Sequence, residues 1–356
     1  MNKMSFRWYG DGDLITLAQI KQIPGVTEIV SELPNIPNGE VWPGEQIAGL
    51  KAKINQSGFE FHVVESLHVH DAIKLGTADR DHYIENYRQS LVNLAANGIT
   101  TVCFSFMPVF NWTRTDFSYR LPDGSTSLAF KQQELEGGID SFLANFKRQN
   151  GGVELPGWSS RRIAELPDIY RQFQGITEEQ LRSNLAYFVK QILPTCERVG
   201  ITLAIHPDDP PMPLFGLPRI YKNASDIRQI MNLADSKQLG ITLCVGSLGE
   251  NPKNDVPGII REFVPSGRVP FVHVRNLKWD GDGDFHETAH LSSEGSLDMY
   301  EIMKALHDSK FTGNIRPDHG RMIWGEQGRP GYGLYDRAMG INYLNGLWEA
   351  IDKTNK

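Results

Sequence analysis

A repeating unit constrains the fold of this chain more than any other feature of its sequence. In each copy a helix-like run ends at a glycine, a short apolar strand follows, and a polar residue stands where the strand ends. Segment 200–206 is an example: Gly200 is typical of a helix cap, 201–205 has the length of a strand, and His206 follows it. Strands that alternate with helices in this way predict a parallel sheet with helical crossovers.

The unit recurs along the whole chain. The expected strands are 5–9, 25–31, 59–65, 100–106, 201–205, 240–244, 269–275 and 313–318. The expected helices are 14–23, 44–56, 79–97, 177–199, 224–235, 256–263, 296–309 and 334–351, with Asp13 capping the first and a Thr177–Gln180 capping box at the start of the fourth. Eight such pairs predict an α/β protein with a (β/α)8 TIM barrel, in a single domain over residues 1–356.

One segment, 108–176, interrupts the alternation after the fourth strand. It holds an aromatic and polar stretch, a turn at 121–125, and helix-like pieces at 127–136 and 138–149. A connection longer than about 15 residues with structure of its own is usually functional. We therefore expect an insertion that forms a lid over the barrel mouth, and the alternative is an oligomer contact. Another polar loop, 278–294, is expected to be solvated.

Composition and charge restrict the partners of the chain. Its 356 residues carry a formal net charge of −7, with 40% hydrophobic and 22% charged residues, whereas nucleic-acid-binding proteins are usually basic. No apolar run reaches the roughly 18 residues of a membrane span. The N-terminus lacks the apolar region of a signal peptide, and three cysteines fit a reducing compartment. We expect a cytoplasmic homodimer that contacts neither nucleic acid nor membrane.

Four consecutive strands late in the chain end in residues that can bind a metal ion. These residues are His206, Cys244, His273 and Asp318. Each has a structural explanation when taken alone, but neighbouring strands of a closed barrel share one side of its mouth, so the four side chains can converge. Two imidazoles, a thiolate and a carboxylate suit Mn²⁺, Fe²⁺ or Zn²⁺, and a thiolate disfavours Mg²⁺. The sequence therefore predicts a metal site.

Six short motifs are more specific. They are FRWYG at 6–10, GD at 12–13, NWTRT at 111–115, AIHPDDPP at 204–211, VHVRN at 272–276 and RPDHGR at 316–321. Through them the chain resembles the D-mannonate dehydratase family, within the xylose isomerase-like barrel group, over essentially its whole length. The resemblance implies a lyase of the hydro-lyase class that acts in glucuronate (hexuronate) catabolism. It implies dehydration of D-mannonate to 2-keto-3-deoxy-D-gluconate with Mn²⁺ (manganese) or Fe²⁺ (iron).

That reaction removes a proton from C2 and hydroxide from C3, so it needs a cation at the carboxylate, a base and an acid. His319 directly follows Asp318 and titrates in a useful range, and Tyr332 lies downstream between two glycines. We predict that His319 and Tyr332 transfer the two protons, in an order that the sequence leaves open. The alternatives are that His319 orients Asp318 and that Tyr332 packs at the barrel rim, with Tyr335 as a weaker candidate.

Substrate contacts are expected from the remaining strand ends and from the insertion. An arginine can hold a carboxylate through two hydrogen bonds, and a tryptophan can cover the polyol chain. The predicted substrate-binding residues are Arg7, Trp112, Arg114, Asp208, Arg275 and Asn276. The alternatives are a solvated charge for Arg114, neutralisation of neighbouring carboxylates for Arg7 and Arg275, and orientation of the ligand histidines for Asp208.

Three other functions compete with dehydration. A metal-dependent sugar isomerase or epimerase on the same barrel is the main alternative, although such enzymes usually work with carboxylates and Glu65 is the only obvious glutamate at a strand end. A metal-dependent endonuclease conflicts with the negative charge. A sugar-acid binding protein would have no need for His319 and Tyr332 beside the ligands. The fold alone does not separate these functions.

Overall fold

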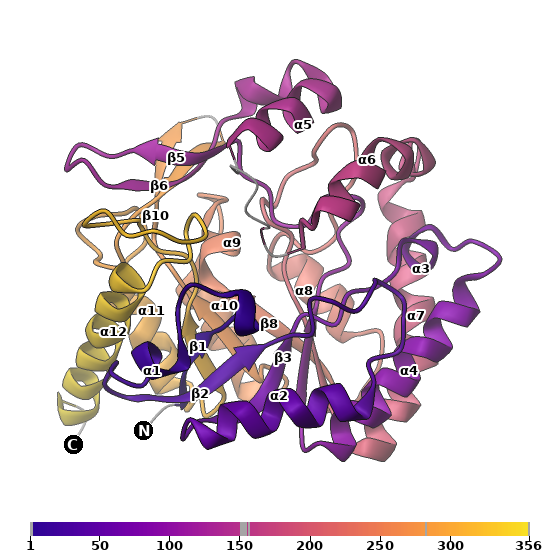
Figure 1. The fold of residues 1–356 in the computed structure, drawn as a ribbon, viewed down its shortest axis with the longest axis horizontal. Helices are drawn as coiled ribbons and strands as arrows, with labels where there is room; N and C mark the ends of the chain where they lie inside the picture. Colours follow the sequence, from indigo (N-terminus) through magenta and orange to yellow (C-terminus); the bar gives the residue numbers. More distant parts are fainter. Residues whose placement is uncertain (1–2, 150–154, 156, 282, 355–356) are drawn as a thin grey trace.

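The computed structural model describes residues 3–149, 155, 157–281 and 283–354. Parallel strands close into a barrel in the order β1-β12-β9-β8-β7-β4-β3-β2 (Figure 1), which confirms the predicted TIM barrel. The barrel strands are β1 (Lys3–Arg7), β2 (Val26–Ser31), β3 (Glu60–Glu65), β4 (Thr101–Phe104), β7 (Thr202–Ile205), β8 (Leu239–Cys244), β9 (Phe271–Val274) and β12 (Asn314–Pro317).

Helices cover the outside of this barrel (Figure 1). They are α1 (Leu17–Ile20), α2 (Gly44–Gln56), α4 (Arg80–Ala96), α7 (Glu178–Val199), α8 (Ala224–Met231), α10 (Val256–Phe263), α11 (Met299–Asp308) and α12 (Tyr335–Thr354). Shorter elements are α3 (Asp71–Leu75), α9 (Val245–Gly249) and the 3-10 turns η1 (Gly10–Gly12) and η3 (Val264–Ser266). None of the helices in the described ranges has both the length and the apolar character that a membrane crossing requires.

Local sequence signals explain where the helices begin and end. Thr177 and Gln180 form the predicted capping box of α7, and Gly200 ends that helix with a φ of 77°, a conformation that glycine adopts without steric cost. The cap of α1 is Thr16. Asp13 instead accepts hydrogen bonds from the backbone N–H groups of Tyr9 and Ile15. The prediction for Asp13 was wrong because a Thr-x-x-Gln capping box follows it directly.

A second sheet lies over one end of the barrel, near the top of the view in Figure 1. Its strand order is β10-β11-β6-β5. The segment after β4 supplies β5 (Asp116–Arg120) and β6 (Thr126–Phe130), followed by η2 (Gln132–Leu135), α5 (Gly138–Gln149) and α6 (Ser160–Phe173), and the loop after β9 supplies β10 (Leu277–Gly281) and β11 (Asp284–Glu287). We call these four strands the accessory sheet.

The accessory sheet corrects two expectations. The helix expected over 127–136 is a strand in its first half, because Ala129 and Phe130 pair with His286 and Phe285 of β11. The loop expected to be solvated contains the β10–β11 hairpin instead, and beyond it His290 is buried and contacts the carbonyl oxygen of Val274 at 3.1 Å. Tertiary pairing overrides local propensity in both segments.

Candidate metal and proton-transfer site

The carboxyl ends of four neighbouring strands bring the predicted ligands to one side of the barrel mouth. His206 follows β7, Cys244 ends β8, His273 lies in β9 and Asp318 follows β12. The ligand atoms of His206, Cys244 and His273 lie within 4.8 Å of one another. Asp318 lies beside them, because its Oδ2 is 3.4 Å from Sγ of Cys244. We call His206, Cys244 and His273 the metal-ligand group, and Asp318 its adjoining carboxylate.

Hydrogen bonds fix the two imidazoles of this group. Nδ1 of His206 lies 2.7 Å from the carbonyl oxygen of Pro207, and because a carbonyl only accepts, this nitrogen carries the proton. The lone pair on Nε2 of His206 therefore faces Nδ1 of His273, 3.2 Å away. Burial, together with the charge of Arg316, holds the pKa of His273 well below its usual value. Both rings can thus offer a lone pair to a cation.

The adjoining carboxylate and the thiol have opposite protonation tendencies. Burial alone would raise the pKa of Asp318, but the nearby charges of His319 and Arg316 hold it well below its usual value. Two guanidinium groups donate to it at 2.9 Å, from Nε of Arg275 and Nη1 of Arg316. Burial and the charge of Asp318 raise the pKa of the Cys244 thiol well above its usual value. Cys244 is thus a thiol that donates to Asp318, and it would have to lose its proton to bind a cation.

The residues of the group fit a divalent transition-metal ion. Nε2 of His273 is buried without a hydrogen-bond partner, and the nearest carboxylate oxygen, Oε1 of Glu65, is 3.4 Å away. A cation on Nδ1 would place the proton of this ring on Nε2, facing that carboxylate. Two neutral imidazoles, a sulfur and a carboxylate are donors that Mn²⁺, Fe²⁺ and Zn²⁺ accept. The unpartnered nitrogen and the mixed donor set both favour an ion at this position.

Beside the metal-ligand group, the two predicted proton-transfer residues contact each other. Nε2 of His319 lies 2.7 Å from the hydroxyl of Tyr332, and Nδ1 lies 2.7 Å from Oε1 of Glu287. His319 and Tyr332 are buried, and burial raises the pKa of Tyr332 well above its usual value. Trp112 packs over the imidazole, with 5.1 Å between ring centroids. The structure thus places His319 and Tyr332 together in a water-poor environment.

A buried network of charges lies behind this pair. Arg114 and Arg275 each pair with Asp209, Glu250 and Glu287, and all five side chains are at most 2% exposed. We call these five residues the buried charge network. Burial and the charge of Asp209 raise the pKa of Glu250 well above its usual value. Burial also acts on Glu287, but the charges of His319, Arg275 and Arg114 lower its pKa overall. A buried guanidinium is costly unless it is paired in this way.

Most of the predicted substrate-binding residues form ion pairs or hydrogen bonds with other groups of the protein. Arg7 pairs with Glu32 at 2.8 Å, and Arg114 and Arg275 belong to the buried charge network. Asp208 accepts from two backbone N–H groups at 2.7 Å, and the amide of Asn276 binds backbone groups of Leu277, Leu291 and Leu297. Of the six predicted residues, Trp112 contacts the proton-transfer pair directly. Arg114 is therefore not the solvated lid charge considered above, because three carboxylates surround it.

Sequence reasoning missed Glu287, which contacts His319 directly. It lay in the segment expected to be a solvated loop. The sequence Asp-Gly-Asp-Gly at 280–283 is a hairpin signal, and a hairpin that turns at its second Asp-Gly pair would have returned Glu287 to the end of the strand that carries His273. The structure shows this arrangement, since Glu287 pairs in register with Leu277 at the start of β10.

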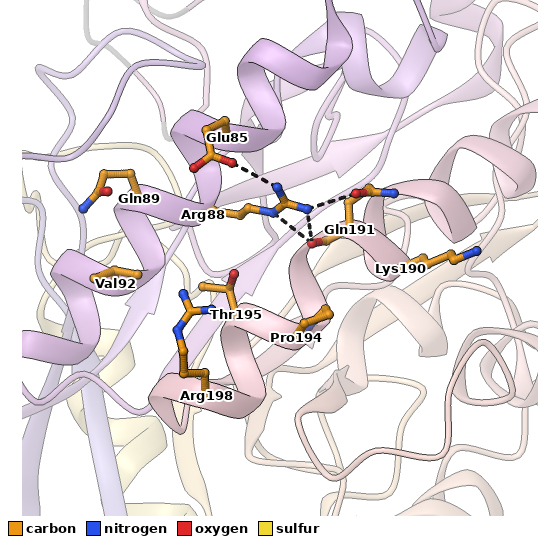
Figure 2. Close-up of a pocket in the computed structure, with 9 residues that line it drawn as sticks. All are labelled: Glu85, Arg88, Gln89, Val92, Lys190, Gln191, Pro194, Thr195 and Arg198. Atoms are coloured by element: carbon orange, nitrogen blue, oxygen red, sulfur yellow. Dashed lines mark hydrogen bonds and ion pairs between the residues drawn. The ribbon is translucent and has the colours of Figure 1, made fainter.

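A separate hollow of about 400 Å³ lies on the outside of the barrel, between α4 and α7 (Figure 2). Pro194 within α7 has no N–H to donate along the helix. Gln191 lies about one turn before Pro194 in α7. Its carbonyl oxygen accepts hydrogen bonds from Nε and Nη2 of Arg88 in α4, at 2.9 and 2.7 Å (Figure 2). The polar groups of this hollow thus join two helices, and its lining includes none of the predicted site residues.

The closed barrel places the chain in the fold class of the xylose isomerase-like TIM-barrel proteins. A xylose isomerase domain protein from Planctomyces limnophilus shares the fold, with a TM-score of 0.57 and 12% identity over 99% of both chains. A profile of the family D-mannonate dehydratase (UxuA) matches residues 1–356. The chain belongs to the D-mannonate dehydratase family.

Individual relatives agree with this assignment. Mannonate dehydratase of Geobacillus thermodenitrificans is 52% identical, over 99% of this chain and 96% of that protein. The enzyme of Lactococcus lactis subsp. cremoris is 50% identical over 99% and 100%. The crystal structure of mannonate dehydratase from Streptococcus suis serotype 2 has a TM-score of 0.90 and 46% identity, over 100% of this chain and 96% of that one. An L-ribulose 3-epimerase, at 13% identity and a TM-score of 0.52, shares the fold alone, so the epimerase alternative is not favoured.

Proposed function

We propose that this protein is a hydro-lyase that dehydrates D-mannonate to 2-keto-3-deoxy-D-gluconate in hexuronate catabolism. The single observation that carries the proposal is the 2.7 Å contact between His319 and Tyr332, made beside the metal-ligand group in a chain of the D-mannonate dehydratase family. Loss of water across C2 and C3 needs one group to accept a proton and another to donate one. These two residues can meet both needs.

The proposed ligands of the metal are His206, Cys244, His273 and Asp318, and the proposed ion is Mn²⁺ or Fe²⁺. When bound, such an ion supplies Lewis-acid stabilisation of the negative charge that develops next to the substrate carboxylate. The protein contributes the fixed rings, since the proton on Nδ1 of His206 is held by the carbonyl oxygen of Pro207 at 2.7 Å. Guanidinium groups of Arg275 and Arg316 keep Asp318 ionised.

His319 is the proposed base and Tyr332 the proposed acid. The carboxylate of Glu287 can only accept, so the proton of a neutral His319 sits on Nδ1, and Nε2 presents a lone pair. That lone pair takes the proton from C2. Burial keeps the Tyr332 hydroxyl protonated, and it gives its proton to the departing C3 hydroxyl, which leaves as water. The resulting enol rearranges to the 2-keto acid.

The contact between the two residues lets the site return to its starting state. After one turnover His319 holds an extra proton and Tyr332 is a phenolate. A proton passing from Nε2 to the phenolate oxygen over the 2.7 Å contact restores both groups. No external proton donor is needed, which suits a pair that Trp112 partly covers.

The remaining proposed residues act on the substrate or on the walls of the site. Trp112 covers the polyol chain beside His319. Arg7, Arg114 and Arg275 are proposed to contact the substrate carboxylate, and their ion pairs with Glu32, Glu287 and Asp318 hold their guanidinium groups in place. Asp208 and Asn276 shape the mouth by holding loop backbone. The segment 108–176 is the proposed lid, and it joins the accessory sheet through β6.

The experiment that tests the function uses chelator-treated protein and D-mannonate, with and without added Mn²⁺ or Fe²⁺, followed by NMR of the product. We expect the 2-keto acid only after the metal is added. An aldose, a ketose or a C2 epimer as the product would instead support the isomerase or epimerase alternative. Full turnover without any divalent ion would contradict the metal assignment.

We also propose that the protein is cytoplasmic and a homodimer. Three free, buried cysteines suit a reducing compartment. An exposed aromatic pair supports self-association: Trp324 and Tyr335 are 75% and 44% exposed, and their ring centroids lie 5.7 Å apart. Light scattering should give twice the 40.1 kDa mass of the chain. A mass equal to that of one chain would contradict the dimer.

A further inference from the structure

One residue of the site belongs neither to the metal-ligand group nor to the proton-transfer pair. Glu287 places Oε1 2.7 Å from Nδ1 of His319, and the two side chains are 1% and 3% exposed. A neutral imidazole has one proton, and which nitrogen carries it depends on the partner of the other. A buried carboxylate at Nδ1 selects the tautomer whose lone pair is on Nε2, the nitrogen that faces Tyr332.

The position of Glu287 is fixed from two directions. Backbone pairing fixes its main chain, because Glu287 is opposite Leu277 in the β10–β11 hairpin, and β11 in turn pairs with β6. Guanidinium groups fix its carboxylate, because Nε and Nη2 of Arg114 donate to Oε1 at 3.0 and 2.7 Å. A carboxylate held in this way can orient the ring that contacts it, and such supporting contacts decide how well a reacting group is placed.

Glu250 offers a comparison within the same network. It pairs with Arg114 and Arg275 at 2.9 and 2.7 Å, as Glu287 also pairs with both, but its contacts include no atom of His319. The two carboxylates therefore share their burial and their arginine partners, but only Glu287 contacts the imidazole, and the pKa of Glu287 is lowered whereas that of Glu250 is raised. Substituting each residue in a separate variant therefore distinguishes an effect on the buried charge network from an effect on the orientation of His319.

We propose that Glu287 is a positioning residue for the proton-transfer pair, which sets the tautomer and the orientation of His319. This inference rests on the proposed function, since it assigns Glu287 a role only if His319 moves a proton. It also gives the accessory sheet a task, because β11 carries Glu287 to the barrel mouth. The sheet is then part of the apparatus that orients His319 as well as a cover.

The test compares Glu287→Leu, which removes the acceptor, with Glu287→Gln, which keeps one acceptor oxygen, and with the control Glu250→Leu. We expect Glu287→Leu to lower kcat by about 10²-fold or more with little change in KM, as happens when a catalytic histidine loses its orienting carboxylate. Glu287→Gln should recover much of this loss. Glu250→Leu should lower kcat much less than Glu287→Leu does, because Glu250 shares the arginine partners but not the contact with His319.

A spectroscopic measurement keeps the proposal testable if Glu287→Leu does not fold. The parent protein is labelled with ¹⁵N-histidine and loaded with diamagnetic Zn²⁺, and its NMR spectrum is compared with that of His319→Asn. The imidazole signals that are missing from the variant spectrum belong to His319. We expect a protonated Nδ1 and an unprotonated Nε2. A proton on Nε2 in the parent would overturn the inference, and so would an unchanged kcat in Glu287→Leu alongside an inactive His319→Asn. If His319→Asn itself kept full turnover of D-mannonate, the dehydratase function would stand, but the proton-transfer role of His319 would be wrong and this inference with it.

Discussion

Three histidines at the barrel mouth differ in what holds their second nitrogen. A backbone carbonyl holds Nδ1 of His206, Nε2 of His273 has no hydrogen-bond partner, and a carboxylate holds Nδ1 of His319. A carbonyl only orients a ring, whereas a carboxylate also stabilises the ring once it takes up a second proton. The imidazoles of His206 and His273 are thus suited to binding a metal ion, and that of His319 is suited to proton transfer.

His319→Asn should keep the metal and lose turnover, because asparagine can hydrogen-bond but cannot titrate. General acid–base groups typically contribute about 10²- to 10⁴-fold in rate, and we expect a loss in that range. In deuterated water, His319→Asn should fail to exchange the C2 proton of D-mannonate, whereas Tyr332→Phe should still exchange it. The opposite exchange result would reverse the two roles, and loss of the metal from His319→Asn would make His319 a ligand.

Cys244→Ser should weaken metal retention more than it weakens the fold, since sulfur is the soft donor of the group. The measurement is the metal-to-protein ratio after dialysis against a weak chelator, together with the thermal midpoint. Cys196→Ser is the control, because Cys196 is equally buried but lies in α7, away from the mouth. Equal metal retention in the two variants would remove Cys244 from the ligand set.

Lys74 offers a prediction about stability away from the site. Burial lowers its pKa from 10.5 to about 8 although Asp71 lies nearby. Between these two values the unfolded chain binds the proton and the folded chain does not, so stability rises with pH across that window. Relative to Lys74→Met, the parent should therefore gain free energy of unfolding between about pH 8 and 10.5. Urea unfolding at both ends measures this difference, and a difference independent of pH would contradict the burial effect.

At the scale of elements, Arg114 links the accessory sheet to the barrel. Arg114 follows β4 and forms an ion pair with Glu287 on β11. It also pairs with Asp209, which follows β7, and with Glu250, which follows α9. Arg114→Met should cost about 3–5 kcal/mol of unfolding free energy, since it leaves buried carboxylates without their partner. Adding Glu250→Leu should restore part of that loss by removing one of these carboxylates. Additive losses in the double variant, measured by urea unfolding, would show that the two residues do not interact.

The sequence was informative for elements held by local signals. The capping box at Thr177 and the glycine at 200 predicted both ends of α7, and the structure confirms them. It was misleading where a strand needs a distant partner: β6 pairs with β11, and three barrel strands, β7, β8 and β9, lie between them in the chain. Ser127–Phe130 carries no alternating pattern that distinguishes it from a helix, because both faces of β6 are buried there.

At the scale of the whole molecule, closure of the barrel explains which parts of the site were predictable. Once β7, β8, β9 and β12 are known to be neighbours, the convergence of His206, Cys244 and His273 follows from their positions at strand ends. Glu287 was not predictable in this way, since it reaches the mouth from a hairpin and not from a barrel strand. Nor could Arg114 be assigned to a buried network without its three carboxylate partners in view.

The connectivity of the accessory sheet has a consequence for synthesis of the protein on the ribosome. The β5–β6 hairpin is made long before β11, so the edge of β6 that later pairs with β11 has no partner while β7, β8 and β9 are being translated. Unpaired edges of this kind invite association with other chains. β12 is also the last strand to join the barrel, and His319 and Tyr332 follow it. A nascent chain therefore carries three of its proposed metal ligands before it has either of the two residues proposed to move protons.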